Sequence, residues 1–462
     1  MVCAEYAPLA KTGGLADAVT GLSEALVKRG HDVRVLLPKY AHIAVPATAV
    51  ERRAGASGEF RYWEAPAGNG APPLYLLDLG DLAATSIYTG DDRDGLRFLL
   101  LADAASALGA ALDWQPDVLH CHDWHAALVP ALQAVRGATP TPVVLTLHNV
   151  GYQGVFAEGL LADNGYADVL RAIDPAASAG GYVNYLRAGV RSATAITTVS
   201  PTHAQEICTP EYGMGLEDVL AARRADLTGI LNGVDYSTWS PDTDPHLAEH
   251  YDAADLAPKY KLKGALCARL GLVPDQSAPL IAVVSRLVMQ KGIDLVAAAL
   301  PTLLAETRAS FAMLGSGEPV LTAALAAVAT DNRRRVSFTN GYNEDLAHQI
   351  IAGSDLLFVP SRYEPCGLTQ MYALKFGSVP VVRMTGGLAD TVEHFDPVTG
   401  RGNGSVFRDA DAGGLLWGTR EALAWFDEPA AWTRVIANGM RADFSWQRQA
   451  RPYETVYRRV QR

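Results

Sequence analysis

The sequence predicts an α/β protein built from two Rossmann-like, doubly wound domains. Its 462 residues are too many for one hydrophobic core, so more than one domain is expected. Apolar strands, glycine-containing turns and amphipathic helices alternate in both halves, which is typical of parallel sheets covered by helices. The alternation stops after residue 235, where Asp, Pro and Ser become frequent up to residue 258, and we predict a hinge there.

The first strand–turn–helix unit carries a glycine pair. Residues 1–4 resemble the tail of a strand and fall short of the roughly five or six residues usual for one, so we expect preceding residues to be missing. Gly13 and Gly14 give a tight turn where backbone approaches a ligand, with Lys11 beside them. The following helix has its apolar face at Leu15, Val19, Leu22 and Leu26. Because the glycines do not form Gly-x-Gly-x-x-Gly, a dinucleotide is not indicated.

The rest of the first half continues this rhythm. Residues 41–95 are less regular and predict hairpins that leave the main sheet. A helix is expected at 97–112, and strands are expected at residues 31–37, 117–122, 143–147, 196–200 and 229–235. Asp123 and His148 each follow one of these strands, and ligands of open α/β sheets gather at such ends. Asp123 is therefore a candidate for binding a sugar hydroxyl, and His148 is either functional or a core histidine.

Three histidines close to Asp123 raise the alternative of a metal site. His120, His122 and His125 all lie within five residues of one another. His120 and His122 are expected on one face of a strand, but no Cys or Glu at a suitable spacing completes a ligand set. The sequence therefore favours no metal here.

The second half carries cations and an exposed aromatic at its strand ends. A helix is expected at 259–270, and strands are expected at residues 280–284, 311–317, 336–339, 355–360 and 379–382. Arg286 and Lys291 flank the turn after the first of these strands, which suits a diphosphate, although two solvated surface cations are the alternative. Tyr342 follows the third strand and is able to stack on a base.

Glu364 lies at a predicted strand-to-helix elbow. The residues after it, Gly367, Leu368 and Thr369, offer backbone N–H groups at a helix start, which is a natural anion site. An acid beside an anion site suggests chemistry on a charged substrate. Alone, this stretch favours the alternative of a surface glutamate near a capped helix.

Charge and cysteine usage limit the function classes. The net charge is −11, from 39 basic and 50 acidic residues, which argues against nucleic acid or an anionic membrane as a bulk partner. The five cysteines are scattered and odd in number, which favours a reduced, cytoplasmic protein. No apolar run approaches the length of a membrane span, and we expect no signal peptide.

Seven motifs in sequence order carry a family resemblance. They are Lys-Thr-Gly-Gly-Leu at 11–15, His-Cys-His-Asp-Trp-His at 120–125, His-Asn at 148–149, Leu-Asn-Gly-Val-Asp at 231–235, Ser-Arg-Leu-x-x-Gln-Lys-Gly at 285–292, Glu-Pro-Cys-Gly-Leu-Thr-Gln at 364–370 and Thr-Gly-Gly-Leu at 385–388. Together they resemble bacterial glycogen synthase and plant starch synthase, the ADP-glucose-dependent glycosyltransferase family 5. The likeness covers essentially the whole chain.

The resemblance implies a GT-B fold with a deep interdomain cleft. The expected domains are residues 1–240, a hinge at 241–258, a nucleotide-sugar domain at 259–444, and a last helix at 445–462 that crosses back to the first domain. The implied reaction moves glucose from ADP-glucose to the non-reducing end of glycogen or another α-1,4-glucan, with retention at the anomeric carbon and without a metal or other cofactor.

The resemblance also implies roles for individual residues. Lys11, Gly14, Asn149, Asn232, Tyr342, Cys366, Gly367, Leu368 and Thr369 would bind the nucleotide sugar. Glu364, His148, Arg286, Lys291 and Asp123 would be the catalytic group. Glucosyl transfer passes through an oxocarbenium-like state while the diphosphate departs, so Arg286 and Lys291 would meet the leaving charge. No nucleophile is evident opposite Glu364, which fits a front-face mechanism.

Three rival functions are kept beside this one. The same fold could use UDP-glucose or another glycan acceptor. A non-catalytic glucan-binding paralogue is disfavoured because Lys11, Arg286, Lys291 and Glu364 are all present. A nicotinamide dehydrogenase is disfavoured because the Gly-x-Gly-x-x-Gly motif and its acidic ribose partner are missing.

Overall fold

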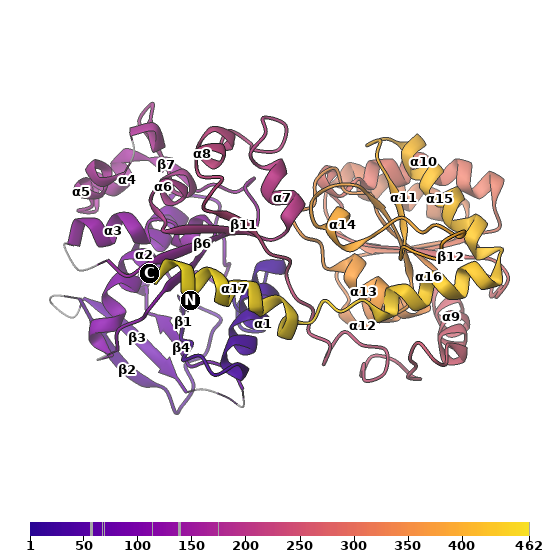
Figure 1. The fold of residues 1–462 in the computed structure, drawn as a ribbon, viewed down its shortest axis with the longest axis horizontal. Coiled ribbons are helices and arrows are strands. Elements are labelled where there is room, and N and C mark those ends of the chain that lie inside the picture. The colour runs from indigo at the N-terminus through magenta and orange to yellow at the C-terminus, as the bar shows by residue number, and fades with distance from the viewer. Residues whose placement is uncertain are drawn as a thin grey trace. The chain divides into compact units, whose positions relative to one another are not determined.

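The computed structural model describes residues 1–55, 59–66, 68, 70–112, 114–136, 140–173 and 175–461. The chain forms two compact units: unit 1 comprises Met1–Gly233 and Trp446–Arg462, and unit 2 comprises Val234–Ser445 (Figure 1). The chain therefore passes between the units twice, at residues 233/234 and at residues 445/446.

Unit 1 contains a mainly parallel sheet in two four-stranded parts, with orders β1-β4-β3-β2 and β11-β10-β6-β5. The strands are β1 (Val35–Pro38), β2 (Val50–Ala54), β3 (Phe60–Ala65), β4 (Leu74–Leu77), β5 (Leu119–His122), β6 (Val143–Leu147), β10 (Ala195–Thr198) and β11 (Leu227–Gly229). Val2 joins the two parts, because it forms parallel bridges to Leu36 of β1 and to Cys121 of β5. The segment that the sequence predicted as a strand tail thus lies at the centre of the sheet.

The strands that follow this central segment in the chain are added first on one side of it and then on the other. β1 and β4 lie on one side of it, and β5, β6, β10 and β11 follow in order on the other. This is the topological switch point where open α/β sheets bind ligands. The residues that follow the central segment and β5 therefore meet at the binding edge of unit 1.

The irregular stretch 41–95 contains a hairpin, as predicted, but it extends the main sheet and does not leave it, which corrects the prediction. β2 and β3 pair antiparallel, and β3 pairs antiparallel with β4. β4 itself was not predicted, and it returns parallel to β1. A second, small antiparallel sheet has the order β7-β9-β8, with β7 (Val155–Ala157), β8 (Ser178–Ala179) and β9 (Tyr182–Asn184).

The helices of unit 1 cover its sheet and include the last helix of the chain. They are α1 (Gly14–Lys28), α2 (Asp92–Ala111), α3 (Val129–Arg136), α4 (Glu158–Asp163), α5 (Ala167–Ala172), α6 (Tyr185–Ser192), α7 (Pro201–Glu206), α8 (Glu217–Ala222) and α17 (Trp446–Val460), with 3₁₀ turns η1 (Gly80–Leu82), η2 (Trp124–Ala126) and η3 (Pro175–Ala177). α17 packs against α1 (Figure 1). The contact requires Gly21, since a Cβ there would lie 1.9 Å from Nε1 of Trp446.

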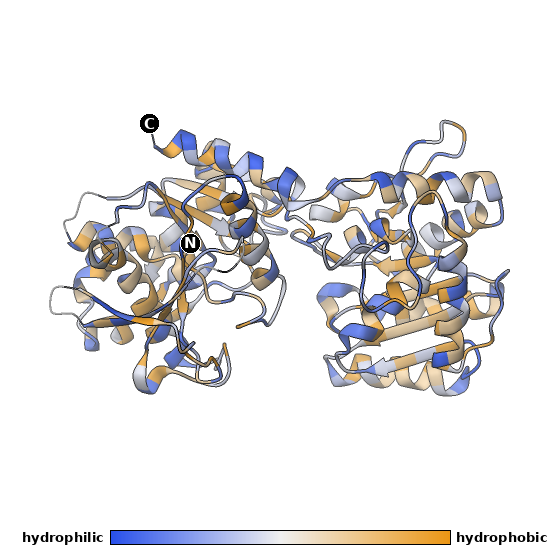
Figure 2. Ribbon diagram, turned by 90° about the horizontal axis from the view of Figure 1, so that it is seen from below, coloured by the Kyte–Doolittle hydropathy of each residue, from blue (hydrophilic) through white to orange (hydrophobic). Residues whose placement is uncertain are grey.

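Unit 2 is a six-stranded, fully parallel sheet of order β14-β13-β12-β15-β16-β17. Its strands are β12 (Leu280–Val284), β13 (Ser310–Gly315), β14 (Val336–Asn340), β15 (Leu356–Val359), β16 (Val379–Arg383) and β17 (Ser405–Phe407). In chain order this is the Rossmann arrangement 3-2-1-4-5-6, with its switch point between β12 and β15. The strands are nearly continuous apolar runs, as buried parallel strands are (Figure 2).

The helices of unit 2 lie before its first strand, between consecutive strands and at the end of the unit. They are α9 (Ala257–Leu270), α10 (Ile293–Glu306), α11 (Pro319–Asp331), α12 (Glu344–Gly353), α13 (Thr369–Lys375), α14 (Gly386–Thr391), α15 (Ala412–Phe426) and α16 (Pro429–Arg441), with one 3₁₀ turn, η4 (Met289–Lys291). None of the helices that the structure describes is long and apolar enough to cross a membrane.

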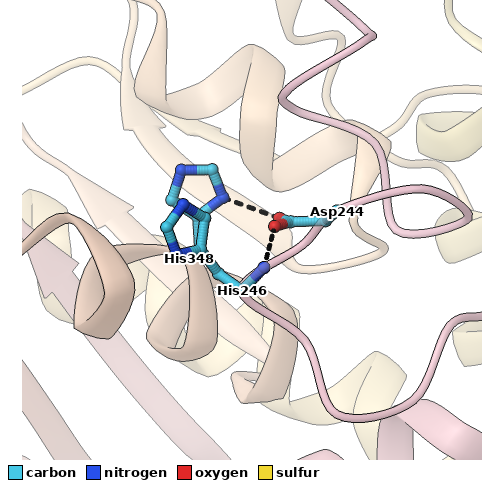
Figure 3. A group of neighbouring side chains, drawn as sticks. All are labelled: Asp244, His246 and His348. Carbon is cyan, nitrogen blue, oxygen red and sulfur yellow. Dashed lines mark hydrogen bonds and ion pairs between the residues drawn. The ribbon is translucent and has the colours of Figure 1, made fainter.

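The stretch expected to be the hinge, residues 241–258, lies within unit 2 and is bonded to it. Asp244 accepts a hydrogen bond from Nδ1 of His348 at 2.6 Å and from the backbone N–H of His246 at 2.8 Å (Figure 3). The hydroxyl of Tyr251 donates to the carbonyl of Phe376 at 2.8 Å. Asp, Pro and Ser here make tight turns and buried anchors, and the chain passes from unit 1 into unit 2 earlier, at residue 234.

Candidate active site

Unit 2 places the predicted cations and the predicted acid at its switch point. β12 ends at Val284 and is followed by Arg286, whereas β15 ends at Val359 and leads to Glu364. These two strands are neighbours and parallel, so their carboxyl ends lie at the same edge of the sheet. Arg286, Lys291 and Glu364 are therefore brought together by topology.

Glu364 is a buried acid with a cation and a hydroxyl on one oxygen. Its side chain lies 2.5 Å from Nζ of Lys291 and 2.9 Å from Oγ of Ser361, both measured to Oε2. The residue is only 5% exposed, and its other carboxylate oxygen is not engaged by these two groups. Because one partner is a lysine, the carboxylate is neutralised within unit 2 and does not stand as an isolated charge.

Two glycines let the surrounding loops approach closely enough to form this arrangement. A Cβ on Gly292, which has a φ of +67°, would lie 2.1 Å from the carbonyl oxygen of Pro360. A Cβ on Gly387 would lie 2.0 Å from the carbonyl oxygen of Cys366, and the N–H of Gly387 donates to the carbonyl of Glu364 at 3.0 Å. Both positions require glycine because backbone meets backbone there.

Arg286 contrasts with Lys291 because it is exposed. Among the residues that the structure describes, no acid forms an ion pair with it. Tyr342 lies beyond β14 and is 79% exposed. Both side chains are thus accessible to a ligand, and their roles in holding a diphosphate and a base stay predictions.

The backbone after Glu364 turns sharply into α13. Gly367 has a φ of +73°, and a Cβ there would lie 2.4 Å from Oε1 of Gln370. The amide of Gln370 donates to the carbonyls of Cys366 and Gly367 at 3.1 and 2.9 Å, which fixes the turn. Leu368 and Thr369 begin a helix of only seven residues, so the anion site predicted here depends more on the nearby cations than on a helix dipole.

Unit 1 adds an acid that sequence reasoning missed. Glu5 follows the central segment of the sheet and is 4% exposed. Its Oε2 accepts from the backbone N–H groups of Thr12 and Gly13 at 2.7 and 3.0 Å, and its Oε1 accepts from the hydroxyl of Tyr88 at 2.6 Å. The glycine loop thus has an internal anion on two of its N–H groups. The signal that could have found Glu5 is its position directly after a strand.

The remaining features of the glycine loop are at the surface. α1 begins at Gly14, and Gly13 precedes it in an extended conformation without a side-chain cap. Nζ of Lys11 lies 2.8 Å from Oδ1 of Asp17, and its side chain is 42% exposed. A ligand that binds Lys11 would therefore compete with, or add to, an exposed ion pair.

Asp123 holds a strained backbone at the end of β5. Its φ of 54° and ψ of −169° lie in a region that is nearly confined to glycine. Oδ1 accepts from the N–H of His148 at 2.7 Å and from that of Asn149 at 3.4 Å. In this strained conformation, the side chain of Asp123 connects the ends of two neighbouring strands, β5 and β6.

Burial also changes the protonation of Asp123. Desolvation raises the pKa of this carboxyl to about 7, while the hydrogen bonds from His148 and Asn149 act in the opposite direction, and the nearby charge of Glu5 raises it further. Asp123 therefore gains or loses its proton near neutral pH, unlike an ordinary aspartate.

His148 and the histidines of β5 form a row of neutral rings. Nε2 of His148 lies 3.1 Å from Nδ1 of His122, and the rings of His122 and His120 are 4.2 Å apart. Burial lowers the pKa of His148 and of His125 to about 3, and it lowers the pKa values of His122 and His120 well below the usual range. The rings are uncharged at neutral pH, and His148 is the one that is partly exposed.

The other predicted residues of unit 1 lie at the same strand ends. Oδ1 of Asn149 accepts from the N–H of Gly151 at 2.9 Å. Asn232 follows β11 and is buried, and its Oδ1 has no hydrogen-bond partner among the described residues. The nitrogens of His120 bond Tyr457 at 2.7 Å and Thr146 at 2.6 Å, so this histidine already has two partners that are not metals.

Comparisons with known proteins show the family of this chain. Residues 1–222 match the family model of the starch synthase catalytic domain, and residues 271–432 match that of glycosyl transferases group 1. The chain is 42% identical to glycogen synthase of Rhodospirillum rubrum over 473 residues, which is 99% of this chain and 97% of that protein. The chain belongs to the glycogen and starch synthase family. Glycogen synthase of Anaeromyxobacter dehalogenans is likewise 42% identical, over 99% of this chain and 98% of that protein.

Solved structures extend the result to the fold. The catalytic domain of starch synthase IV from Arabidopsis thaliana, bound to ADP and acarbose, matches with a TM-score of 0.89 and 34% identity over 99% of this chain and 98% of that one. Sucrose-phosphate synthase from Thermosynechococcus elongatus, at 19% identity and a TM-score of 0.58, shares the fold alone. The predicted GT-B fold and the predicted family are confirmed, and this glycogen and starch synthase family member is a glucosyltransferase.

Proposed function

We propose that this synthase transfers glucose from ADP-glucose to the non-reducing end of an α-1,4-glucan such as glycogen, with retention at the anomeric carbon. The observation that carries the proposal is the Lys291–Glu364 pair beside the exposed Arg286 at the switch point of unit 2. The relative from Arabidopsis thaliana, described as bound to ADP and acarbose, supports both a nucleotide and a glucan as ligands.

The proposed roles in unit 2 follow from charge. Arg286 and Lys291 would neutralise the diphosphate as its negative charge grows in the transition state. Glu364 would hold glucose hydroxyls or the developing positive charge of the oxocarbenium-like carbon. Tyr342 would stack on the adenine, and the turn formed by Cys366, Gly367, Leu368 and Thr369 would contact the sugar and the distal phosphate.

The proposed roles in unit 1 follow from neutral, buried groups. His148 and Asn149 would contact the transferred glucose, and Asp123 would hold their backbone in place or bind an acceptor hydroxyl. Lys11 and Gly14 would meet the nucleotide part of the donor, and Asn232 would join the same group of ligands. These assignments rest on position at the strand ends and on the family motifs.

The proposed mechanism is a front-face displacement. The departing phosphate oxygen would accept the proton of the acceptor hydroxyl while the glucosidic bond forms on the same face that the phosphate leaves. Retention without a covalent intermediate fits the absence of a second carboxylate next to Glu364 among its described hydrogen-bond partners, which are Lys291 and Ser361. We further propose that no metal is required and that the enzyme is cytoplasmic, since its five cysteines are scattered and odd in number.

The deciding experiment measures product release from two donors. Purified protein with ADP-glucose and glycogen is expected to release ADP at the same rate with and without EDTA. With a maltooligosaccharide as the acceptor in place of glycogen, NMR of the elongated product is expected to show a new α-1,4 linkage. Faster turnover with UDP-glucose would show that UDP-glucose, and not ADP-glucose, is the preferred donor. If neither donor released its nucleotide with any glucan, the proposal would be refuted.

A further inference from the structure

His122 is a buried histidine to which the proposed reaction assigns no role. It is the last residue of β5 and is 1% exposed. Its Nδ1 lies 3.1 Å from Nε2 of His148, and its Nε2 is buried without a hydrogen-bond partner among the residues that the structure describes. Among the described residues, only Nδ1 of the two ring nitrogens therefore has a hydrogen-bond partner, and that partner is His148.

The environment of the His122 ring selects its tautomer. With both rings neutral, one of the two facing nitrogens must carry the proton of the bond between them. If His122 carried its proton on Nε2, a buried N–H would be left without an acceptor, which is rarer in proteins than an unsatisfied acceptor. His122 is therefore the donor through Nδ1, and Nε2 of His148 is the acceptor.

We propose that His122 is a positioning residue that fixes His148 as the tautomer with its proton on Nδ1. His148 then presents an N–H from its partly exposed ring, and the ring can donate to an oxygen at the end of β6. This inference rests on the proposed function in one respect: that oxygen would be a hydroxyl of the transferred glucose. The tautomer itself follows from the contacts within unit 1.

The row of rings behind His122 holds it in place. The ring of His120 lies against that of His122, tilted by 30° with ring centroids 4.2 Å apart, and the two nitrogens of His120 bond the hydroxyls of Tyr457 and Thr146. The ring of His122 is thus enclosed between His120 and His148, whose centroid lies 5.3 Å away. The backbone of His148 is fixed separately, by Oδ1 of Asp123.

Two replacements of His122 separate the proposed bond from simple packing. Asparagine places an amide N–H where Nδ1 of histidine lies, whereas leucine fills similar space without a donor. We expect His122→Leu to lower kcat by about 10–100-fold with the donor KM changed by less than about threefold, as for other groups that orient a reacting side chain. His122→Asn is expected to recover kcat to within about threefold of the unsubstituted enzyme.

Tyr457→Phe is the matched control, because it removes a hydrogen bond one ring farther from His148. It is expected to lower the melting temperature without changing kcat by more than about twofold. If Tyr457→Phe and His122→Leu lost the same kcat at the same loss of melting temperature, the effect would be general loosening of unit 1 and the proposal would be wrong.

A spectroscopic measurement tests the tautomer without any substrate. Two-bond ¹H–¹⁵N correlation spectra of histidine-labelled protein distinguish the Nδ1–H from the Nε2–H form, and a His148→Gln variant assigns the signals. We expect the Nδ1–H form of His148 in the unsubstituted and His122→Asn proteins, and a mixture in His122→Leu. An Nε2–H form of His148 in the unsubstituted protein would overturn the inference, even if glucosyl transfer is observed. If no glucosyl transfer is observed, the proposed function fails, but the spectra still decide the tautomer of His148.

Discussion

The binding edges of the two units are built on the same topology and from opposite chemistry. In unit 2 the switch point carries an exposed guanidinium and a lysine–glutamate pair at 2.5 Å. In unit 1 it carries uncharged histidine rings, a strained Asp123 whose pKa is raised to about 7, and a glutamate that bonds its own glycine loop.

Under the proposed function, the chemistry of unit 2 would suit a diphosphate and that of unit 1 would suit a sugar. A diphosphate gains negative charge as it leaves, so accessible cations are useful next to it. A sugar has no net charge, and directional hydrogen bonds from rigid, neutral groups distinguish its hydroxyls better than ions do. The comparison predicts that charge changes in unit 2 affect turnover most, whereas changes in unit 1 affect position and pH dependence.

The largest effect is expected from Glu364→Gln, which keeps the shape of the side chain and removes its charge. Turnover should fall by about 10²–10³-fold, because the variant loses the charge that is proposed to stabilise the reacting carbon. Steady-state ADP release checks this. Glu306→Gln is the control, since Glu306 pairs with Arg420 at the exposed surface of the same unit and its loss should leave turnover unchanged. Full activity of Glu364→Gln would show that turnover does not depend on the charge of Glu364, which would contradict the predicted contrast between the two units.

Arg286→Ala is expected to follow, with kcat/KM for the donor lowered by about 10²-fold, because an accessible cation meets charge that grows in the transition state. Lysine at this position should restore only part of the loss, since it lacks the planar fork. Donor kinetics of both variants, with Arg420→Ala as the surface control, provide the measurement. Equal kcat/KM in all three would show that the exposed guanidinium does not meet the donor.

Asp123→Asn tests the unit 1 side through stability. The pKa of Asp123 is raised from 3.8 to about 7, so the folded protein holds this proton to a higher pH than the unfolded chain does. Its contribution is therefore fully present below about pH 4 and is lost as pH rises through 7. Between pH 5 and 8 the unsubstituted protein should lose about 2–3 kcal/mol that the variant keeps. Urea unfolding at several pH values measures this, and parallel curves for the two proteins would contradict it.

The smallest effect is expected from Glu5→Gln. The amide oxygen can still accept from the N–H groups of Thr12 and Gly13, but it carries no negative charge, so both bonds to the loop become weaker. The donor KM should rise by about tenfold while kcat changes by less than about threefold, as expected when charge-assisted bonds are replaced by neutral ones. An unchanged KM would mean that the glycine loop needs no internal anion.

Much of the fold could be predicted because local patterns determine it. The strands at 143–147 and 280–284 coincide with β6 and β12, since each is an apolar run bounded by polar residues. β4 and β17 were not predicted, because strands of three or four residues have no distinctive pattern in sequence. The hinge was predicted too late in the chain, because Asp244 and Tyr251 look like loop residues in sequence and are buried anchors in the fold.

The site divides in the same way. Strand ends are visible in sequence, so Asp123, His148, Arg286 and Glu364 could be selected one by one. The bonds between them depend on packing between distant segments. The 2.5 Å contact of Lys291 with Glu364, and the contact of His122 with His148, have no signal in local sequence. Glu5 had a signal in its strand-end position, but the short first strand concealed it.

Because α17 is the last helix of the chain and belongs to unit 1, the two units can be completed at different times during synthesis. Unit 2 is one continuous segment, whereas unit 1 needs residues from both ends of the chain. The apolar face of α1, with Leu22 and Leu26, is covered by Trp446 and Tyr453 of α17. On the ribosome, unit 2 can therefore complete its core before unit 1, which must hold an uncovered α1 until the last residues emerge. Release of the chain before residue 446 would leave that apolar face open to other partners, so the final helix also controls when unit 1 is finished.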